Sequence, residues 1–547
     1  MATDATGVFS RWEILLTGAN GFVGKVLLAM LCDRFPGFRK LHVLVRAGSR
    51  EAARERFRVE VLGSPALARV AVDEGKIAVI RGDIGEPGCG IAAEDLATLV
   101  GRPLLVIHCA GLVEFFPPLD QAFRANVDGV ENVVSLSKRL GAKLLHVSTC
   151  YVCGEAEGLV EETEPVPGFY PRRSGPEDRS FDHREEIRYC RKLMHEIGAL
   201  AAHASASQVA QLLTEAGRQR AARWGWVNTY TYTKSLGEQI IACERPRPLW
   251  PPRPARESEK PAPGTPERQP PAGPVDGSSS FAREPGLEWT IVRPAIVESA
   301  LDFPFPGWVE GGRTAAPLVL MALGGLRRWT VRKEAPLEVV PVDLVASSIL
   351  AIAALLAEGR AEPVYQLGTA DVNPVMLRPL VKLLNSQAGR GKSAGRPGAL
   401  WAGLARLRRP VRFVSPERAR AERLRMQQAL NRAQRLLTRM RLLLKTSGLP
   451  GKSALAGLGL TLRAAGLQAL IREQTLELYQ PFIHDNRFVF ETENIRRARR
   501  ALSERDRELL PWTPESLDWN RYWVENQIRG VQKWVGPQGQ TRRKVKV

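Results

Sequence analysis

The chain has 547 residues, of which 44% are hydrophobic and 25% are charged, and this balance excludes a chain that is disordered throughout. Its length is several times that of a modest domain and predicts two or more folding units with a large core. The 78 Lys and Arg residues against 58 Asp and Glu residues leave a charge of +20, which favours polyanionic partners such as phosphorylated cofactors, coenzyme A, acidic lipid or nucleic acid.

The first 150 residues alternate short apolar runs with helical patterns. The runs are EILLTG, KLHVLV, KIAVIRGDI, LLVIHCAG and AKLLHVST, and VGKVLLAMLCDRF between the first two has the pattern of a helix. Such alternation predicts a Rossmann-type, doubly wound parallel sheet of the α/β class. Nearly all strand positions are apolar, as a sheet covered on both faces requires, and ligands bind such sheets beyond the carboxyl ends of the strands.

Two insertions interrupt this pattern. Residues 181–223 predict a helical insertion, and the helix TYTYTKSLGEQIIA follows it. Residues 244–285 are dense in Pro, Gly, Ser and charge, and predict a disordered insert because they bury too little surface to offset the entropy of ordering. The pattern EWTIVRPAIVES then resumes the sheet, so we assign residues 1–385 to one Rossmann domain.

A basic, mostly helical C-terminal domain is expected over residues 386–547, after the break NSQAGRGKSAGRPGA at 385–399. Ser415 and Pro416 start a predicted helix that Gly448 ends, and apolar residues recur along it at spacings of four and three. This stripe predicts a core or homodimer seam, with contact to a membrane surface as the alternative. The stripe comprises Met426, Leu430, Ala433, Leu437, Met440 and Leu444.

No uninterrupted apolar segment reaches the length of a membrane span. The longest, VASSILAIAALLA at 345–357, predicts a buried core helix. The N-terminal segment has acidic residues and no apolar core of signal-peptide length, and the seven scattered cysteines indicate reduced thiols. We therefore expect a cytoplasmic protein, with peripheral contact to a membrane surface left open.

The segment TGANGFVG lies directly after the first predicted strand and opens a helix. Its glycines permit a tight turn and close approach of backbone, so a pyrophosphate can sit on the positive end of the helix. The predicted cofactor loop comprises Gly18, Ala19, Asn20, Gly21, Phe22, Val23 and Gly24.

The second strand ends in Arg46, at the place where an acidic residue would hold a free ribose 2′-hydroxyl. Arg46, with Arg50 nearby, can pair with a 2′-phosphate, so the predicted cofactor is NADPH; a plain surface arginine is the alternative. Two further strand ends fit a dinucleotide laid along the sheet, and they contribute Asp83, Ile84, Ala110 and Gly111.

The segment NTYTYTK carries two tyrosines ahead of Lys234. On a helix, residues four apart share a face and residues two apart are rotated by about 200°, so Tyr230 adjoins Lys234 and Tyr232 does not. We expect Lys234 to lower the pKa of the Tyr230 hydroxyl and to bond the nicotinamide ribose. A hydroxyl at the end of the strand KLLHVST completes the predicted catalytic set, and Ser148 and Thr149 both qualify by type.

The segments TGANGFVG, VSTCYVCG and NTYTYTK together resemble the extended short-chain dehydrogenases/reductases, whose reactive set is a Ser or Thr, a Tyr and a Lys. Counting five residues back from the glycine of STCYVCG, as in that family, favours Thr149 over Ser148. A longer set of segments is similar to the alcohol-forming fatty acyl-CoA reductases with their male-sterility-type C-terminal domain, among them VIHCAGLVEF, IVRPAIVESALDFPFPGWVEG and LLPWTPESLDWNRYW.

This resemblance implies reduction of a long-chain acyl-CoA by NADPH to a fatty alcohol, by way of an aldehyde. The alternatives are a reductase that stops at the aldehyde, an epimerase, a hydroxysteroid dehydrogenase and a non-catalytic NADPH-sensing scaffold. Binding of nucleic acid would rest on charge alone, because no interleaved aromatic motif accompanies it, and we expect none. We also expect no metal site, because Cys150 and Cys153 form a C-x-x-C pair without a second one.

Overall fold

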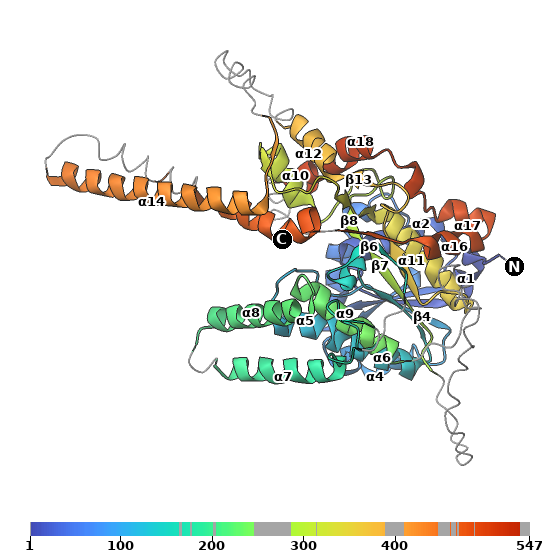
Figure 1. Cartoon of the computed structure of the whole chain (residues 1–547). Coiled ribbons are helices and arrows are strands. Elements are labelled where there is room, and N and C mark those ends of the chain that lie inside the picture. Colours follow the sequence, from blue (N-terminus) through green and yellow to red (C-terminus); the bar gives the residue numbers. More distant parts are fainter. Residues whose placement is uncertain are drawn as a thin grey trace, which may run out of the picture.

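The computed structural model describes residues 2–163, 167–175, 178–200, 204–244, 286–312, 314–388, 410–446, 460, 466–467, 470–485 and 487–536. Seven strands form one parallel sheet in the order β12-β7-β5-β4-β1-β2-β3 (Figure 1). The chain enters the sheet at the interior strand β1 and adds strands outward in both directions, which confirms the predicted doubly wound topology. The strands are β1 (Glu13–Thr17), β2 (Lys40–Val45), β3 (Ile77–Arg81), β4 (Leu104–His108), β5 (Lys143–Val147), β7 (Trp289–Pro294) and β12 (Val364–Leu367).

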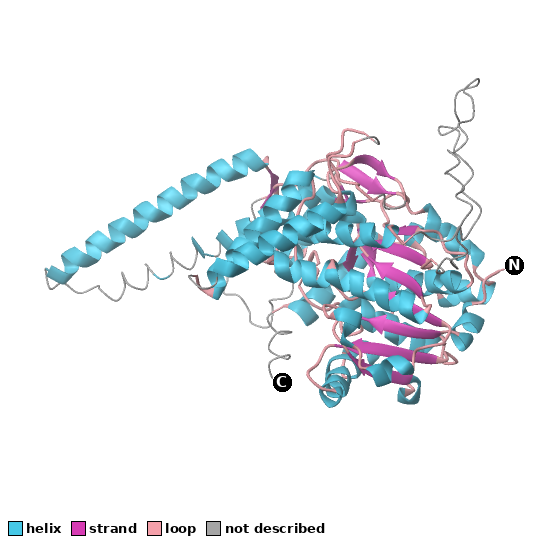
Figure 2. Ribbon diagram, turned by 90° about the horizontal axis from the view of Figure 1, so that it is seen from below, coloured by secondary structure: helices cyan, strands magenta, loops and turns pink. Residues whose placement is uncertain are grey.

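Helices pack on both faces of this sheet, whose strands run across the view in Figure 2. Ile14 and Leu16 of β1 belong to one apolar core, whereas Leu15 belongs to the core on the opposite face. Alternate side chains of a strand point to opposite faces, so an unbroken apolar strand needs both layers. One layer contains α1 (Ala5–Arg11), α2 (Phe22–Arg34) and α11 (Val342–Ala357), and the other contains α5 (Leu119–Asn126), α6 (Asp128–Leu140) and α9 (Thr229–Ala242).

The apolar segment 345–357 lies within α11, all of whose residues are buried. The prediction of a core helix is therefore confirmed. Within the described parts of the chain, no helix combines the length and the hydropathy that crossing a bilayer requires.

The helical insertion predicted at 181–223 is also confirmed, because α7 (His183–Ala199) and α8 (Ala206–Trp224) occupy it. The Asp182 side chain caps α7, and Ser205 forms a capping box at the start of α8. Gly225 ends α8 with φ 96°, a conformation that glycine adopts without strain. Both helices pack beside α9 (Figure 1).

Shorter elements complete the described part of the chain. The short strand pairs are β8 (Ile296–Glu298) with β11 (Val339–Pro341), β10 (Pro336–Leu337) with β13 (Val375–Met376), and β9 (Arg328–Trp329) with β14 (Arg412–Phe413). Further helices are α3 (Arg50–Phe57), α4 (Ala93–Ala97), α10 (Ala316–Leu323), α12 (Leu377–Ser386), α16 (Glu493–Ala501), α17 (Glu504–Leu509) and α18 (Trp519–Arg521).

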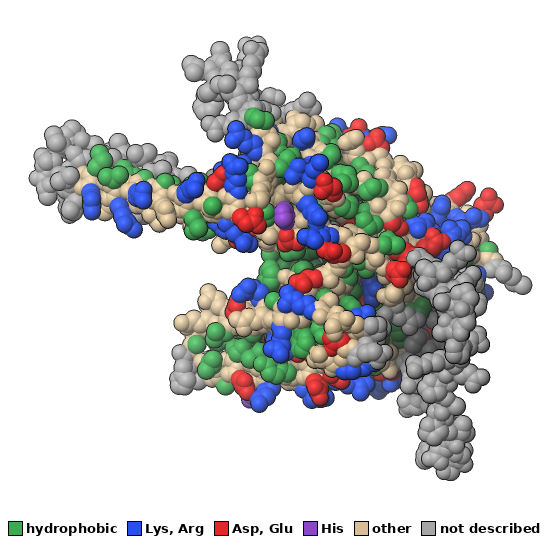
Figure 3. All heavy atoms as spheres, in the orientation of Figure 1, with side chains coloured by type: hydrophobic (Ala, Val, Ile, Leu, Met, Phe, Trp, Pro, Cys, Tyr) green, Lys and Arg blue, Asp and Glu red, His purple; other side chains and the backbone are tan. Residues whose placement is uncertain are grey.

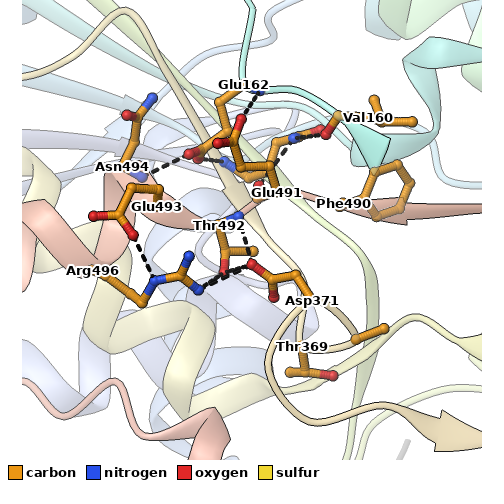
Figure 4. Close-up of polar contacts among 12 residues, drawn as sticks. Val160, Glu162, Thr369, Asp371, Phe490, Glu491, Thr492, Glu493, Asn494 and Arg496 are labelled. Atoms are coloured by element: carbon orange, nitrogen blue, oxygen red, sulfur yellow. Dashed lines mark hydrogen bonds and ion pairs between the residues drawn. The ribbon is translucent and has the colours of Figure 1, made fainter. Parts of the chain in front are cut away.

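Residues 487–536 pack directly against the sheet domain. β15 (Arg487–Phe490) pairs in parallel with β6 (Glu157–Val160), and a polar network follows this pair (Figure 4). The Glu162 carboxylate accepts from the backbone nitrogens of Gln366 at 2.8 Å and Asn494 at 2.6 Å. Asp371 accepts from the Thr492 hydroxyl at 2.7 Å and from Arg496 at 3.0 Å. The division into domains at residue 385 stays a prediction.

The beginning of the chain is held by the same C-terminal segment. The Ala5 nitrogen donates to the Asp506 carboxylate at 2.8 Å, and the Thr6 hydroxyl donates to its other oxygen at 3.1 Å. The Thr3 nitrogen donates to the Ala501 carbonyl at 2.8 Å, so α1 is fixed by residues about 500 positions later in the chain.

The predicted basic helix is α14 (Pro416–Thr446), which projects from the body as an arm with Lys and Arg side chains along it (Figure 3). The stripe is only partly covered: Met426 is 41% exposed and Met440 is 49% exposed. Arg423 pairs with Glu473 and Glu477 at the base of the arm. Dimer and membrane contact both stay predictions, and Gly448 lies outside the described residues. The predicted insert at 244–285 and the break at 385–399 also lie outside them, apart from residues 244 and 385–388.

Candidate active site

The turn after β1 brings its backbone very close to the end of β4. Gly18 has φ 76°, and a Cβ at this position would lie 2.6 Å from the Ala110 nitrogen. A Cβ on Gly24 would lie 2.2 Å from the Gly18 carbonyl oxygen. No side chain fits at either position, so both glycines are needed for the turn that leads through Gly21 into α2.

A cavity of about 490 Å³ opens in front of this turn, at the carboxyl ends of β1 to β4. The backbone cradle, the helix N-terminus and the position at the switch point of the sheet fit a dinucleotide. The predicted residues that line the cavity are Gly18, Asn20, Gly21, Arg46, Asp83, Ile84, Ala110 and Gly111. Four predicted loop residues are not among the lining residues, namely Ala19, Phe22, Val23 and Gly24.

Two arginines that the sequence analysis did not name also line the cavity, Arg56 and Arg124. Arg56 donates to the Arg46 carbonyl oxygen at 2.7 Å and pairs with Glu60 at 3.0 Å. Arg124 pairs with Asp83 at 3.1 Å. The sequence could have indicated Arg56, because Ser49 caps a helix that starts directly after the second strand and carries Arg56. Arg124 could not be found in this way, because it reaches Asp83 only through the tertiary fold.

The two arginines predicted to hold a 2′-phosphate differ in their surroundings. Arg46 is exposed at the cavity, and within the described residues no carboxylate forms an ion pair with it. Arg50 does not line the cavity, and its guanidinium pairs with Glu94 at 2.5 Å and Asp95 at 3.2 Å. A part for Arg50 in cofactor binding stays a prediction.

Tyr230, Lys234 and Thr149 meet beside this cavity. Tyr230 and Lys234 lie one turn apart on α9, and the Thr149 hydroxyl just after β5 interacts with the Tyr230 hydroxyl and lowers its pKa. The Thr149 hydroxyl also donates to the Pro294 carbonyl oxygen at 3.3 Å. The Lys234 ammonium donates to the Val147 carbonyl oxygen at 2.9 Å. A Cβ on the cavity residue Gly111 would lie 3.1 Å from Lys234 Nζ, so the ammonium adjoins the cavity.

The other two candidate hydroxyls lie elsewhere. The Ser148 hydroxyl is buried and has no hydrogen-bond partner among the described residues. Tyr232 is fully buried and donates to the Glu186 carboxylate at 2.5 Å. The two tyrosines point to different sides of α9 because residues two apart on a helix are rotated by about 200°. The Asn228 side chain caps the start of this helix by accepting from the Thr231 nitrogen at 2.8 Å.

Burial changes the pKa of both ionisable groups in this set. It raises the pKa of Tyr230 to about 12, and the hydrogen bond with Thr149 offsets only part of this change. It lowers the pKa of Lys234 to about 8, against the influence of Cys109 and Glu238. The expectation that Lys234 lowers the pKa of Tyr230 is therefore wrong in this structure, because burial of the phenol dominates.

Asn126 fixes the loop that follows β4 to α9. Its side-chain oxygen accepts from the Leu112 nitrogen at 3.0 Å, and its amide donates to the Leu112 carbonyl at 3.0 Å and to Thr233 at 3.1 Å. These bonds hold the loop residue Gly111 against Lys234, so the cofactor cavity and the catalytic helix form one unit.

Comparison with known proteins matches residues 16–270 and 279–349 to the male sterility protein family, a family of nicotinamide-nucleotide-binding domains. The chain belongs to this family. Fatty acyl-CoA reductase 8 of Arabidopsis thaliana is 28% identical over 404 residues, which cover 71% of this chain and 72% of that protein. The alcohol-forming fatty acyl-CoA reductase of Simmondsia chinensis is 27% identical over 386 residues, which cover 68% of this chain and 69% of that protein.

Among solved structures, the reductase domain of a nonribosomal peptide synthetase from Mycobacterium tuberculosis covers 96% of both chains, with 18% identity and a TM-score of 0.47. A likeness of this strength carries no argument about the site. The family membership and the named relatives make the chain an oxidoreductase that uses a nicotinamide cofactor.

Proposed function

We propose that this male sterility family protein reduces a long-chain fatty acyl-CoA to the fatty alcohol, in two steps that each use NADPH. The observation that carries the proposal is the set formed by Tyr230, Thr149 and Lys234 beside a glycine-cradled cavity. The similarity to fatty acyl-CoA reductases, one of them alcohol-forming, supports the choice of substrate and product.

The cofactor residues are proposed from the geometry of the cavity. The backbone of Gly18 and Gly21 holds the pyrophosphate, and Asp83 with Ile84 lies at the adenine end. Arg46 binds the 2′-phosphate, which favours NADPH over NADH because no carboxylate pairs with Arg46 among the described residues. Lys234 reaches the nicotinamide ribose from α9.

When bound, the nicotinamide nucleotide supplies hydride to the carbonyl carbon. The hydroxyls of Tyr230 and Thr149 hold the carbonyl oxygen and stabilise the negative charge that develops there. Burial raises the pKa of Tyr230 to about 12, so its hydroxyl is protonated at neutral pH and carries the proton that the carbonyl oxygen receives. The Lys234 ammonium, whose pKa burial lowers to about 8, is still mostly charged at neutral pH and can hydrogen-bond the nicotinamide ribose.

The complete reduction of one thioester to the alcohol and the free thiol consumes two hydrides and two protons. The first hydride forms a C–H bond, the C–S bond then breaks, and coenzyme A leaves as its thiol with one proton. The aldehyde takes up the second hydride and the second proton, which Tyr230 donates, and becomes the primary alcohol.

The test is incubation of the purified protein with NADPH and hexadecanoyl-CoA, followed by thiol titration and mass spectrometry of the products. We expect equal amounts of free thiol and hexadecanol. Tyr230→Phe lowers the rate by roughly 100- to 10,000-fold, the usual contribution of a positioned acid. Tyr232→Phe is the matched control: it removes a hydroxyl from the same helix outside the catalytic set, and we expect it to leave the rate of reduction unchanged. Absence of thiol release in the unmutated protein, or full activity of Tyr230→Phe, refutes the proposal.

A further inference from the structure

A second cavity lies inside the lobe formed by α10, α12 and residues 479–483. Every residue lining it is hydrophobic, including Leu318 and Val319 from α10 and Leu380 and Leu384 from α12. The one hydroxyl among the lining residues, that of Tyr479, donates to the Thr314 carbonyl at 2.7 Å. The atoms that face this space are apolar, and such a space does not hold water well and suits an apolar ligand.

An aromatic layer of Phe115, Tyr151 and Phe482 connects this cavity to the segments that carry the catalytic residues. Phe482 lines the cavity and stacks on Phe115 with ring centroids 5.2 Å apart. The same ring meets Tyr151, two residues after Thr149, at 5.0 Å. The Phe115 carbonyl in turn accepts from the Tyr230 nitrogen at 3.3 Å. Phe482 therefore lines the apolar cavity and also contacts Phe115 and Tyr151, which lie on the segments next to Tyr230 and Thr149.

We infer that this cavity receives the distal part of the substrate's acyl chain, with Phe115 and Phe482 at its entrance. The inference rests on the proposed function, since it takes the thioester carbonyl to lie between Tyr230 and Thr149. A carbonyl held there directs the chain past the aromatic layer, and each methylene buried among leucines and valines strengthens binding by roughly fourfold. The cavity walls thereby set the preference for chain length.

The cavity is small in this structure, with a volume of about 30 Å³, so its walls move apart when a long chain enters. α10 is the wall suited to move, because glycines lie at both ends of it. Gly311 before the helix has φ 81° and Gly325 after it has φ 88°. Such positions absorb backbone rotation without strain, so α10 can shift as a rigid unit.

The test compares two tryptophan substitutions on α10. Leu318→Trp fills the cavity, whereas Leu320→Trp makes the same change two residues later, outside the lining. We measure kcat/KM for hexadecanoyl-CoA and octanoyl-CoA and take the ratio. Exclusion of two methylenes lowers this ratio by about 16-fold in Leu318→Trp. The ratio stays unchanged in Leu320→Trp. A ratio unchanged in Leu318→Trp, or lowered equally in Leu320→Trp, overturns the inference.

A second measurement needs neither turnover nor a folded Leu318→Trp variant. Trp329 and Trp523 line the cavity, so hexadecanoyl-CoA brominated at its last carbon quenches their fluorescence in the unmutated chain. Trp329→Phe with Trp523→Phe removes that quenching, and persistence of the quenching overturns the inference. If the protein reduces no acyl-CoA but the quenching is found, the proposed function fails while the cavity assignment stands. If the protein reduces acyl-CoA but the brominated substrate does not quench the fluorescence, the cavity assignment fails and the proposed function stands.

Discussion

Arg46→Ala is the sharpest test of the cofactor assignment, because Arg50 offers a matched control four residues away. Arg46 lines the cofactor cavity without a carboxylate partner among the described residues, whereas Arg50 is paired with Glu94 and Asp95. Hydrogen bonds to charged groups contribute about 1.5–3 kcal/mol. Arg46 is exposed, so solvent screening places the loss at the lower end of that range. This corresponds to a loss of roughly 10- to 30-fold in kcat/KM for NADPH.

The assay is the initial rate of nicotinamide oxidation at saturating acyl-CoA, measured with NADPH and with NADH. We expect Arg46→Ala to lower kcat/KM for NADPH and to leave the value for NADH unchanged, because NADH has no 2′-phosphate. In the unmutated protein, a higher salt concentration should reduce the difference in kcat/KM between NADPH and NADH, because salt screens the charge of Arg46. Because Glu94 and Asp95 already hold the Arg50 guanidinium, Arg50→Ala should lower kcat/KM for NADPH by less than Arg46→Ala does. Equal losses with both cofactors, or the same loss in Arg50→Ala, would refute the assignment of Arg46.

Three further predictions concern pH and backbone packing. Burial lowers the pKa of Lys234 to about 8, so its positive charge is present below that pH and is lost above it. The value of kcat/KM for the cofactor should therefore fall as pH rises through 8. A kcat/KM that stays constant up to about pH 9.5 would contradict this. Burial raises the pKa of Glu162 to about 8, above its unfolded value, so its contribution to stability is present below pH 4.5 and is lost as pH rises through 8. Glu162→Gln should therefore flatten the decline of Tm between pH 5 and 8, and an unchanged slope argues against a buried acid there. Gly24→Ala should abolish nucleotide binding, as measured by calorimetry, because its Cβ would lie 2.2 Å from the Gly18 carbonyl oxygen; Gly37→Ala, which meets nothing within 4 Å, is the control that should bind normally.

Local patterns predicted the parts of the molecule that local geometry determines. The apolar runs predicted the strands because a doubly covered sheet leaves no polar position, and the spacing of Tyr230 and Lys234 needed only the pitch of a helix. Arg124 was missed because it pairs with Asp83 across 41 residues, and the pairing of β15 with β6 joins segments about 330 residues apart. The pKa of Tyr230 was predicted in the wrong direction because burial depends on the packed structure and not on the neighbouring residues in sequence.

The attachment of α1 to Asp506 has a consequence for how the chain is made. The helix at residues 5–11 is synthesised well before the carboxylate that binds its Ala5 and Thr6, because Asp506 comes about 500 residues later. Contacts of such long sequence separation form late, because closing the loop costs entropy before any contact is gained. Nascent chains therefore expose α1 until residue 506 has been synthesised, and removal of residues 501–506 would release α1 as well.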